Sequence, residues 1–136
     1  MTTWLTPALF SLFSFGLWGF FTKLSVDHID SKTALVYQTL GVMIISLITL
    51  CTMSFKVTAN AKGVSFGVLT GLAYGVGCLF YFLAASKGKI TNVVTLTSLY
   101  PMITILLSFL ILKEQINLKQ VIGVGFALLA IFLMSD

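Results

Sequence analysis

The sequence contains no arginine and very few charged side chains of any kind. Charged residues make up 9% of the 136-residue chain, whereas soluble domains usually carry about 25%. Hydrophobic residues make up 58%, and a soluble domain of this length could not bury so much apolar surface. The composition therefore excludes an ordinary soluble domain. Five stretches have no charged residue at all, namely residues 1–22, 33–55, 63–86, 90–112 and 120–135.

Four of these stretches are long enough to cross a bilayer, since a spanning helix needs about 20 apolar residues, and the last, residues 120–135, is short. We predict an all-α integral membrane protein with five transmembrane helices in a single domain over residues 1–136. The last helix should begin near Asn117, which stands in capping-box spacing with Gln120, and Lys119 can snorkel. The first stretch lacks the basic start and cleavage site of a signal peptide. Thr6 and Pro7 suggest an N-cap and first position for that span.

No aspartate or glutamate lies inside a predicted span. This absence leaves no candidate for a carboxylate proton relay at the bilayer centre. Catalytic sets, metal-ligand spacings and phosphate-binding motifs are missing too, so we expect neither an enzyme nor a cofactor. In the loop, Asp27, His28 and Asp30 could suggest a metal site. We favour the interpretation that these side chains are solvated charges and that Asp30 or Ser31 is the N-cap of the following helix. Cys51 and Cys78 fall in different spans and are interpreted as inert small apolar residues.

The lysines are divided equally between the two sides of the predicted membrane protein. With five spans, Lys56, Lys62, Lys113 and Lys119 share a side with the N-terminus, and Lys23, Lys32, Lys87 and Lys89 lie opposite. Lysines scattered over loops in this way usually set the orientation of a membrane protein and contact lipid head groups, and they do not indicate nucleic-acid binding. The four-to-four balance could arise by chance. We favour dual topology, in which oppositely oriented copies form a ten-helix antiparallel homodimer about an axis in the membrane plane.

Polar and small residues within the spans mark candidate sites. Gln38 should either bond a neighbouring helix or face a wet cavity, because an unpaired amide is costly in lipid. At about 100° per residue, one face of the third span, about 120° wide, carries Gly63, Gly67, Gly71, Gly75, Tyr74, Cys78 and Tyr81. The glycines should press on a neighbouring helix, and the helices should diverge around the tyrosines to admit a ligand. Alternatively, the glycines only pack and the tyrosines belong to the interfacial aromatic belt.

Pro101 interrupts the fourth span, where it cannot donate a hydrogen bond to the carbonyl of Thr97 and should kink the helix. Thr95, Thr97, Ser98 and Tyr100 cluster around it. Freed backbone carbonyls at membrane depth are tolerated where they are re-satisfied or line a water-filled cavity. The cluster therefore predicts either a binding site or a kink bridged by hydroxyl groups. In the fifth span, Gly123 and Ala127 form another small pair suited to helix packing.

Three motifs give the chain a resemblance to a known family. They are "WGFFTK" ending the first span, "SLYPMITILLSFLILKE" in the fourth and "NLKQVIGVGFALLAIFLM" in the fifth, and they include Trp18, Gly19, Lys23, Tyr100, Pro101, Glu114, Gln120, Gly123 and Gly125. In order and spacing the chain resembles the EamA-type domain of the drug/metabolite transporter superfamily, in its short five-helix branch. The resemblance implies a multi-pass exporter or permease of small metabolites in a prokaryotic inner membrane. Because longer members carry two such domains in inverted orientation, a single domain is expected to dimerise.

These observations together predict a secondary transporter that works by alternating access. The substrate would be small, neutral or zwitterionic and partly apolar. The residues expected to line its cavity are Trp18, Gln38, Tyr74, Tyr81, Thr97, Ser98 and Tyr100, with Pro101 as the hinge. Two alternatives remain open, a non-transporting membrane assembly subunit and one half of a heterodimeric transporter.

Overall fold

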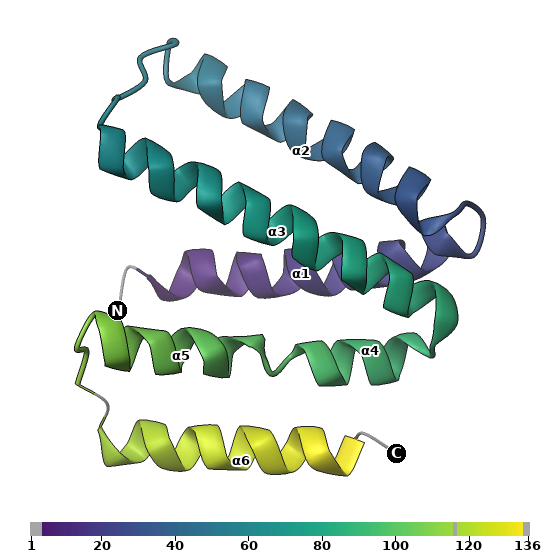
Figure 1. Ribbon diagram of the computed structural model, residues 1–136, viewed down its shortest axis with the longest axis vertical. Coiled ribbons are helices and arrows are strands. Elements are labelled where there is room, and N and C mark those ends of the chain that lie inside the picture. Colours follow the sequence, from purple (N-terminus) through teal and green to yellow (C-terminus); the bar gives the residue numbers. More distant parts are fainter. Residues whose placement is uncertain (1–3, 116, 135–136) are drawn as a thin grey trace. The chain divides into compact units, whose positions relative to one another are not determined.

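The computed structural model describes residues 4–115 and 117–134, which form six helices joined by loops (Figure 1). Within these residues there is no β-strand. The helices group into two compact units, residues 1–87 and 88–136. The first unit holds α1 (Leu5–Val26), α2 (Ser31–Thr52) and α3 (Ala61–Lys87), and the second holds α4 (Ile90–Thr97), α5 (Tyr100–Ile111) and α6 (Leu118–Met134).

The helices confirm four of the five predicted spans by length and composition, and the fifth corresponds to a shorter apolar helix. Among the described residues, α1, α2, α3 and the pair α4–α5 are long and apolar enough to span a bilayer, and the apolar helix α6 is shorter. A helix of 22 residues, the length of α1, extends about 33 Å, close to the roughly 30 Å hydrocarbon core. Consecutive side chains on α1 are exposed, with Leu12 at 71% and Phe13 at 67%. Apolar exposure in several directions is expected of a helix that contacts lipid.

Capping explains where two of the helices begin. Asp30 precedes α2, and its carboxylate accepts hydrogen bonds from the N–H groups of Lys32 at 3.0 Å and Thr33 at 3.1 Å. At α6, Gln120 N–H donates to Asn117 Oδ1 and Asn117 N–H donates to Gln120 Oε1, each at 2.9 Å. Both predicted caps are confirmed. The predicted cap at Thr6 is wrong, because α1 already begins at Leu5 and Pro7 lies inside its first turn, where proline is tolerated.

The core of the first unit lies at one end of its three helices. Ala34, Cys78 and Phe82 are buried together, and Trp18, Val26, Ile29 and Leu35 pack against them. Figure 1 shows α2 and α3 close together near the loop between α1 and α2 and separated toward the loop that joins α2 to α3. The hydroxyl of Ser31 donates to the carbonyl of Phe82 at 3.3 Å across the close end. Alanine and serine at this contact allow the two backbones to approach.

The glycine-bearing half of α3 is the open half of this unit, and its packing against a neighbouring helix stays a prediction. A Cβ placed on Gly67, Gly71 or Gly75 would have no heavy atom of another residue within 4 Å outside the helix's own backbone, and the nearest for Gly63 would be Asn60 Cβ at 4.0 Å. The buried side chains of α3 come later, among them Tyr81 at 8% exposure. Tyr81 therefore packs in the core of the unit. The reason is that Trp18 supplies a flat apolar surface for it, while the glycines offer no side chain to hold α2.

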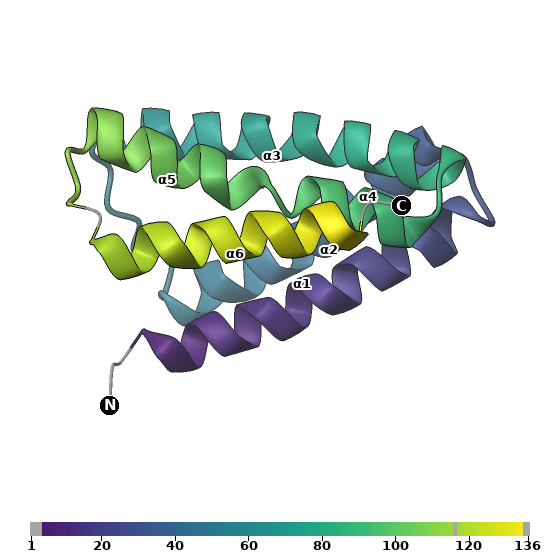
Figure 2. The same cartoon turned by 90° about the horizontal axis from the view of Figure 1, so that it is seen from below.

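The second unit contains the predicted interruption of the fourth span. The helix stops after Thr97 and resumes at Tyr100, with Pro101 in the first turn of α5. Proline has no N–H to continue the ladder to Thr97, so the break occurs one turn ahead of it. In Figure 2, α5 follows α4 through this break, and α6 returns beside them. α6 begins after the Asn117 cap, and a Cβ on Gly123 would meet no heavy atom within 4 Å.

Candidate functional site

Trp18, Gln38 and Tyr81, one from each helix of the first unit, meet in the structure. The indole Nε1 of Trp18 donates to Oε1 of Gln38 at 2.6 Å. The ring of Tyr81 lies 4.5 Å from the Trp18 ring, centroid to centroid, at an interplanar angle of 36°. Aromatic rings at this separation and tilt interact favourably beyond their apolar contact. The expected bond from Gln38 to a neighbouring helix is confirmed, and it fixes the amide with its carbonyl toward α1.

A cavity of about 220 Å³ opens beside this cluster. Trp18 and Gln38 line it, together with Phe21, Thr22, Ser25, Ala34, Tyr37 and Phe82. Gln38 thus meets both alternatives left open by the sequence, since it bonds another helix and also borders a cavity. Thr22 is only 3% exposed and Tyr37 is 61% exposed, so the cavity has a buried wall and an open side.

Sequence reasoning overlooked Thr22 and Ser25 as cavity residues, although their positions were informative. They follow Trp18 by four and seven residues, the spacing that places side chains on one face of a helix. Starting from Trp18, this periodicity alone could have found them. The sequence gives no comparable indication that Tyr37 and Phe82 line the cavity, because they lie on α2 and α3 and reach α1 only through helix packing.

The charged side chains at the end of α1 and in the following loop form ion pairs or hydrogen bonds with nearby groups. Lys23 Nζ lies 2.8 Å from Asp27 Oδ1 and donates to the carbonyl of Ala85 at 3.2 Å. Asp30 caps α2, and Nδ1 of His28 lies 2.7 Å from the carbonyl of Leu24. The three side chains of the Asp27-His28-Asp30 motif therefore have three different local partners, as the interpretation as loop charges with an Asp30 cap predicted.

The remaining predicted site residues lie elsewhere in the fold. Tyr74 sits two turns before Tyr81 on α3 and is 45% exposed. Thr97, Ser98 and Tyr100 belong to the second unit and gather at its helix break. There Thr97 Oγ1 donates to the carbonyl of Val93 at 2.8 Å, and Ser98 Oγ to that of Val94 at 2.7 Å. Such bonds to the carbonyl one turn earlier often bend a helix, so they fit the alternative of a kink bridged by hydroxyl groups.

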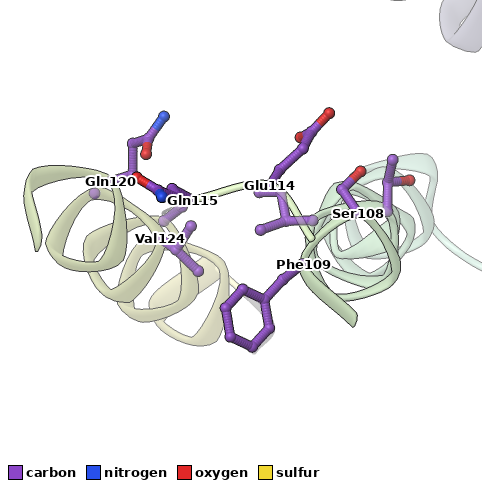
Figure 3. A pocket seen from close by; sticks show the side chains of 10 residues that line it. Ser108, Phe109, Glu114, Gln115, Gln120 and Val124 are labelled. Carbon is purple, nitrogen blue, oxygen red and sulfur yellow. The ribbon is translucent and has the colours of Figure 1, made fainter. Parts of the chain in front are cut away.

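A groove of about 400 Å³ lies between α5 and α6 in the second unit. Figure 3 shows Glu114 and Gln120 on one side of it and Phe109 on the other. Lys113, with a φ of 54°, ends α5 and allows the N–H of Glu114 to reach the carbonyl of Ser108 at 3.3 Å. Glu114, at the end of its span, thus borders a groove that is apolar along Ile105, Val124 and Ala127.

Comparison with protein families connects this membrane architecture to transport. The EamA-like transporter family model matches residues 2–136. The chain belongs to the EamA-like transporter family. The match runs through both compact units and includes the Trp18 cluster and the break before Pro101, and it confirms the resemblance that three sequence motifs had indicated.

Two of the three relatives described next are named as transporters. An uncharacterized transporter from a Sinorhizobium species, from the cobO 3′ region, is 30% identical, with 96% of this chain and 98% of the relative aligned. An uncharacterized protein of Methanocaldococcus jannaschii is 30% identical over 89% of this chain and 88% of its own length. An uncharacterized transporter of Synechocystis is 39% identical, but only 49% of this chain and 19% of that protein align. No solved structure matches the chain.

Proposed function

We propose that this EamA-like chain is a secondary transporter of a small neutral or zwitterionic, partly apolar metabolite in a prokaryotic inner membrane. The observation that carries the proposal is the cavity beside Trp18 and Gln38, which lies among helices that cross the bilayer. Polar groups at membrane depth are costly and commonly belong to solute pathways. Family membership and the names of the relatives support transport.

The working unit in this proposal is an antiparallel homodimer that operates by alternating access. The cavity of about 220 Å³ is smaller than the roughly 300–1,000 Å³ usual for small-molecule sites and has an open side, so a second copy is needed to enclose a substrate. The open glycine face of α3 provides a surface for close helix contact. The equal lysine division supports insertion in both orientations.

Reconstitution distinguishes a transporter from an assembly subunit. The purified full chain is placed in liposomes loaded with a mixture of neutral and zwitterionic metabolites, and efflux is measured by mass spectrometry. We expect selective efflux, which Tyr74→Ala and Ser98→Leu should lower without changing the dimer fraction. Absence of efflux, combined with co-purification of another membrane protein, would instead identify the assembly subunit.

Orientation variants test the antiparallel arrangement. Replacing Lys87 and Lys89 with glutamine leaves the lysine excess on the side of the N-terminus, and replacing Lys56 and Lys62 leaves it on the opposite side. Each variant alone should insert one way and lose transport, whereas the two expressed together should recover it. If either fixed-orientation variant transports as well as the original chain, the antiparallel homodimer is wrong. If the original chain transports only with a related chain of opposite orientation, the unit is a heterodimer.

A further inference from the structure

We propose that the cavity between α1 and α2 binds an uncharged hydrogen-bond-accepting group of the transported molecule, with Thr22 and Gln38 as the donors. The inference rests on the proposed transport function and adds a subsite and a substrate class to it. The class is a small apolar compound, one ring or a short branched chain, that carries an amide, ketone or ester oxygen.

Thr22 supplies the first observation. Its side chain borders the cavity and is 3% exposed, yet its hydroxyl group has no hydrogen-bond partner among residues 4–115 and 117–134. Threonine and serine in helices usually donate to a carbonyl one turn earlier. On α2, Thr39 does so to Leu35, Ser46 to Val42 and Thr49 to Ile45, each at 2.9 Å. No buried side-chain oxygen or nitrogen of the described residues lacks a partner, so the unpaired Thr22 hydroxyl reaches the accessible surface. Because Thr22 lines the cavity, this hydroxyl is available to a molecule there.

Gln38 supplies a second donor with a defined direction. An indole N–H can only donate, so the atom of Gln38 that faces Trp18 is the amide oxygen. The amide NH₂ group has no partner within the described residues and belongs to a side chain that lines the same cavity. The site therefore offers an NH₂ donor and a hydroxyl that can donate, and the complementary ligand group is an acceptor.

The cavity has no charge with which to balance an ionised ligand. None of its lining residues is charged. The nearest ammonium along α1, on Lys23, is already paired with Asp27 at 2.8 Å and bonded to Ala85 at 3.2 Å. An unpaired carboxylate or ammonium among these uncharged walls is disfavoured. The acceptor is accordingly a neutral oxygen.

The walls and the volume limit the apolar part of the ligand. Trp18, Phe21 and Phe82 provide aromatic surface around about 220 Å³. An apolar cavity of about 150 Å³ is already large enough for benzene. A single substituted ring fits the space, whereas a larger compound extends through the open side.

A fluorescence titration tests the subsite directly. The full chain with Trp4→Phe keeps Trp18 as its one tryptophan and is studied in lipid nanodiscs. Benzamide, benzoate and benzylammonium are matched probes with a neutral acceptor, an anion and a cation. We expect saturable binding of benzamide and at least tenfold weaker binding of both ions. Thr22→Val should weaken benzamide binding about tenfold, the effect of losing one buried hydrogen bond, while Thr22→Ser should retain it.

Thr39→Val is the control, because that hydroxyl bonds its own helix, and its benzamide affinity should be unchanged. Equal binding of benzoate and benzamide would overturn the neutral class, and equal affinity in Thr22→Val and Thr39→Val would overturn the subsite. The transport assay distinguishes failure of the proposed transport function from failure of the proposed subsite. Selective benzamide binding without efflux of any solute contradicts the transporter alone, whereas efflux that is insensitive to Thr22→Val contradicts the subsite alone.

Discussion

Ser31 and Phe82 are joined by a hydrogen bond from the Ser31 hydroxyl to the Phe82 carbonyl, at 3.3 Å and across 51 positions of sequence. At the same end of the unit, Lys23 donates to Ala85 at 3.2 Å. The first residue of α2 and the last turn of α1 thus hold the C-terminal part of α3. The glycine end of α3 has no comparable contact with its neighbours in this unit, so the three helices are fastened at one end only.

Removing the Ser31 hydroxyl should loosen the fastened end. Ser31 is 7% exposed, and loss of a buried hydrogen bond costs about 1 kcal/mol. We expect Ser31→Ala to lower the free energy of unfolding in detergent by about that amount, measured by circular dichroism. Ser46→Ala is the control, since Ser46 is exposed and bonds only its own helix; an equal effect in both variants would contradict the interhelical role.

The contributions of Trp18 and Gln38 to the free energy of unfolding should be coupled through their hydrogen bond. In a double-mutant cycle with Trp18→Phe and Gln38→Leu, the coupling energy should be about 0.6–1.7 kcal/mol, the range for hydrogen bonds between membrane helices. Each single variant should also lower transport, because Trp18→Phe releases the Gln38 amide from its fixed orientation and Gln38→Leu removes the amide. Additive effects on unfolding, with no coupling, would show that the 2.6 Å contact contributes nothing to the fold.

The cap at Asp30 should make the stability of α2 dependent on pH. The hydroxyl of Thr33, the Thr33 N–H and the Lys32 N–H hold the pKa of the exposed Asp30 carboxyl below its ordinary value. Because the folded pKa is the lower one, the stabilisation is present above the unfolded value and is lost as pH falls through the folded value. Thermal unfolding between pH 7 and pH 2 should show this loss in the original chain. Asp30→Asn should remove this contribution to the pH dependence, and an unchanged acid slope in that variant would assign it to other groups.

A large side chain on the glycine face should block association without harming the chain itself. A Cβ on Gly71 meets nothing within 4 Å, and leucine favours helix by about 1 kcal/mol over glycine. We expect Gly71→Leu to keep or raise thermal stability while reducing the dimer fraction severalfold in analytical ultracentrifugation. Leu72→Ile, at a 61% exposed position beside the face, should leave the dimer intact. A dimer fraction that survives Gly71→Leu would place the dimer contact elsewhere.

Pro101 should control the flexibility of the fourth span. Pro101→Ala restores an N–H that can bond the Thr97 carbonyl, so it should extend the helix across residues 98–99, which now separate α4 from α5. Transport should fall if the break is a hinge, and hydrogen exchange near Ser98 should slow. Slower exchange with undiminished transport would show that the break is structural only. Pro7→Ala is the matched control, because Pro7 lies in the first turn of α1 and its replacement should change neither quantity.

The sequence was enough to predict the membrane class, four long spans, the caps at Asp30 and Asn117 and the break before Pro101. These features depend on local causes: runs of uncharged side chains, a carboxylate or amide within reach of free N–H groups, and a missing donor at proline. The family could also be inferred, because its motifs are written in residue order.

Only the tertiary structure decided which of the marked residues meet. Trp18, Gln38 and Tyr81 come together because α1, α2 and α3 pack at one end, and that packing depends on Ala34, Cys78 and Phe82 filling a shared space. Helical periodicity specifies which face a side chain occupies, but it does not specify which helix covers that face. For this reason the sequence did not show that the glycine half of α3 lies open within its own unit. It also did not show that Thr22 lines a cavity between α1 and α2.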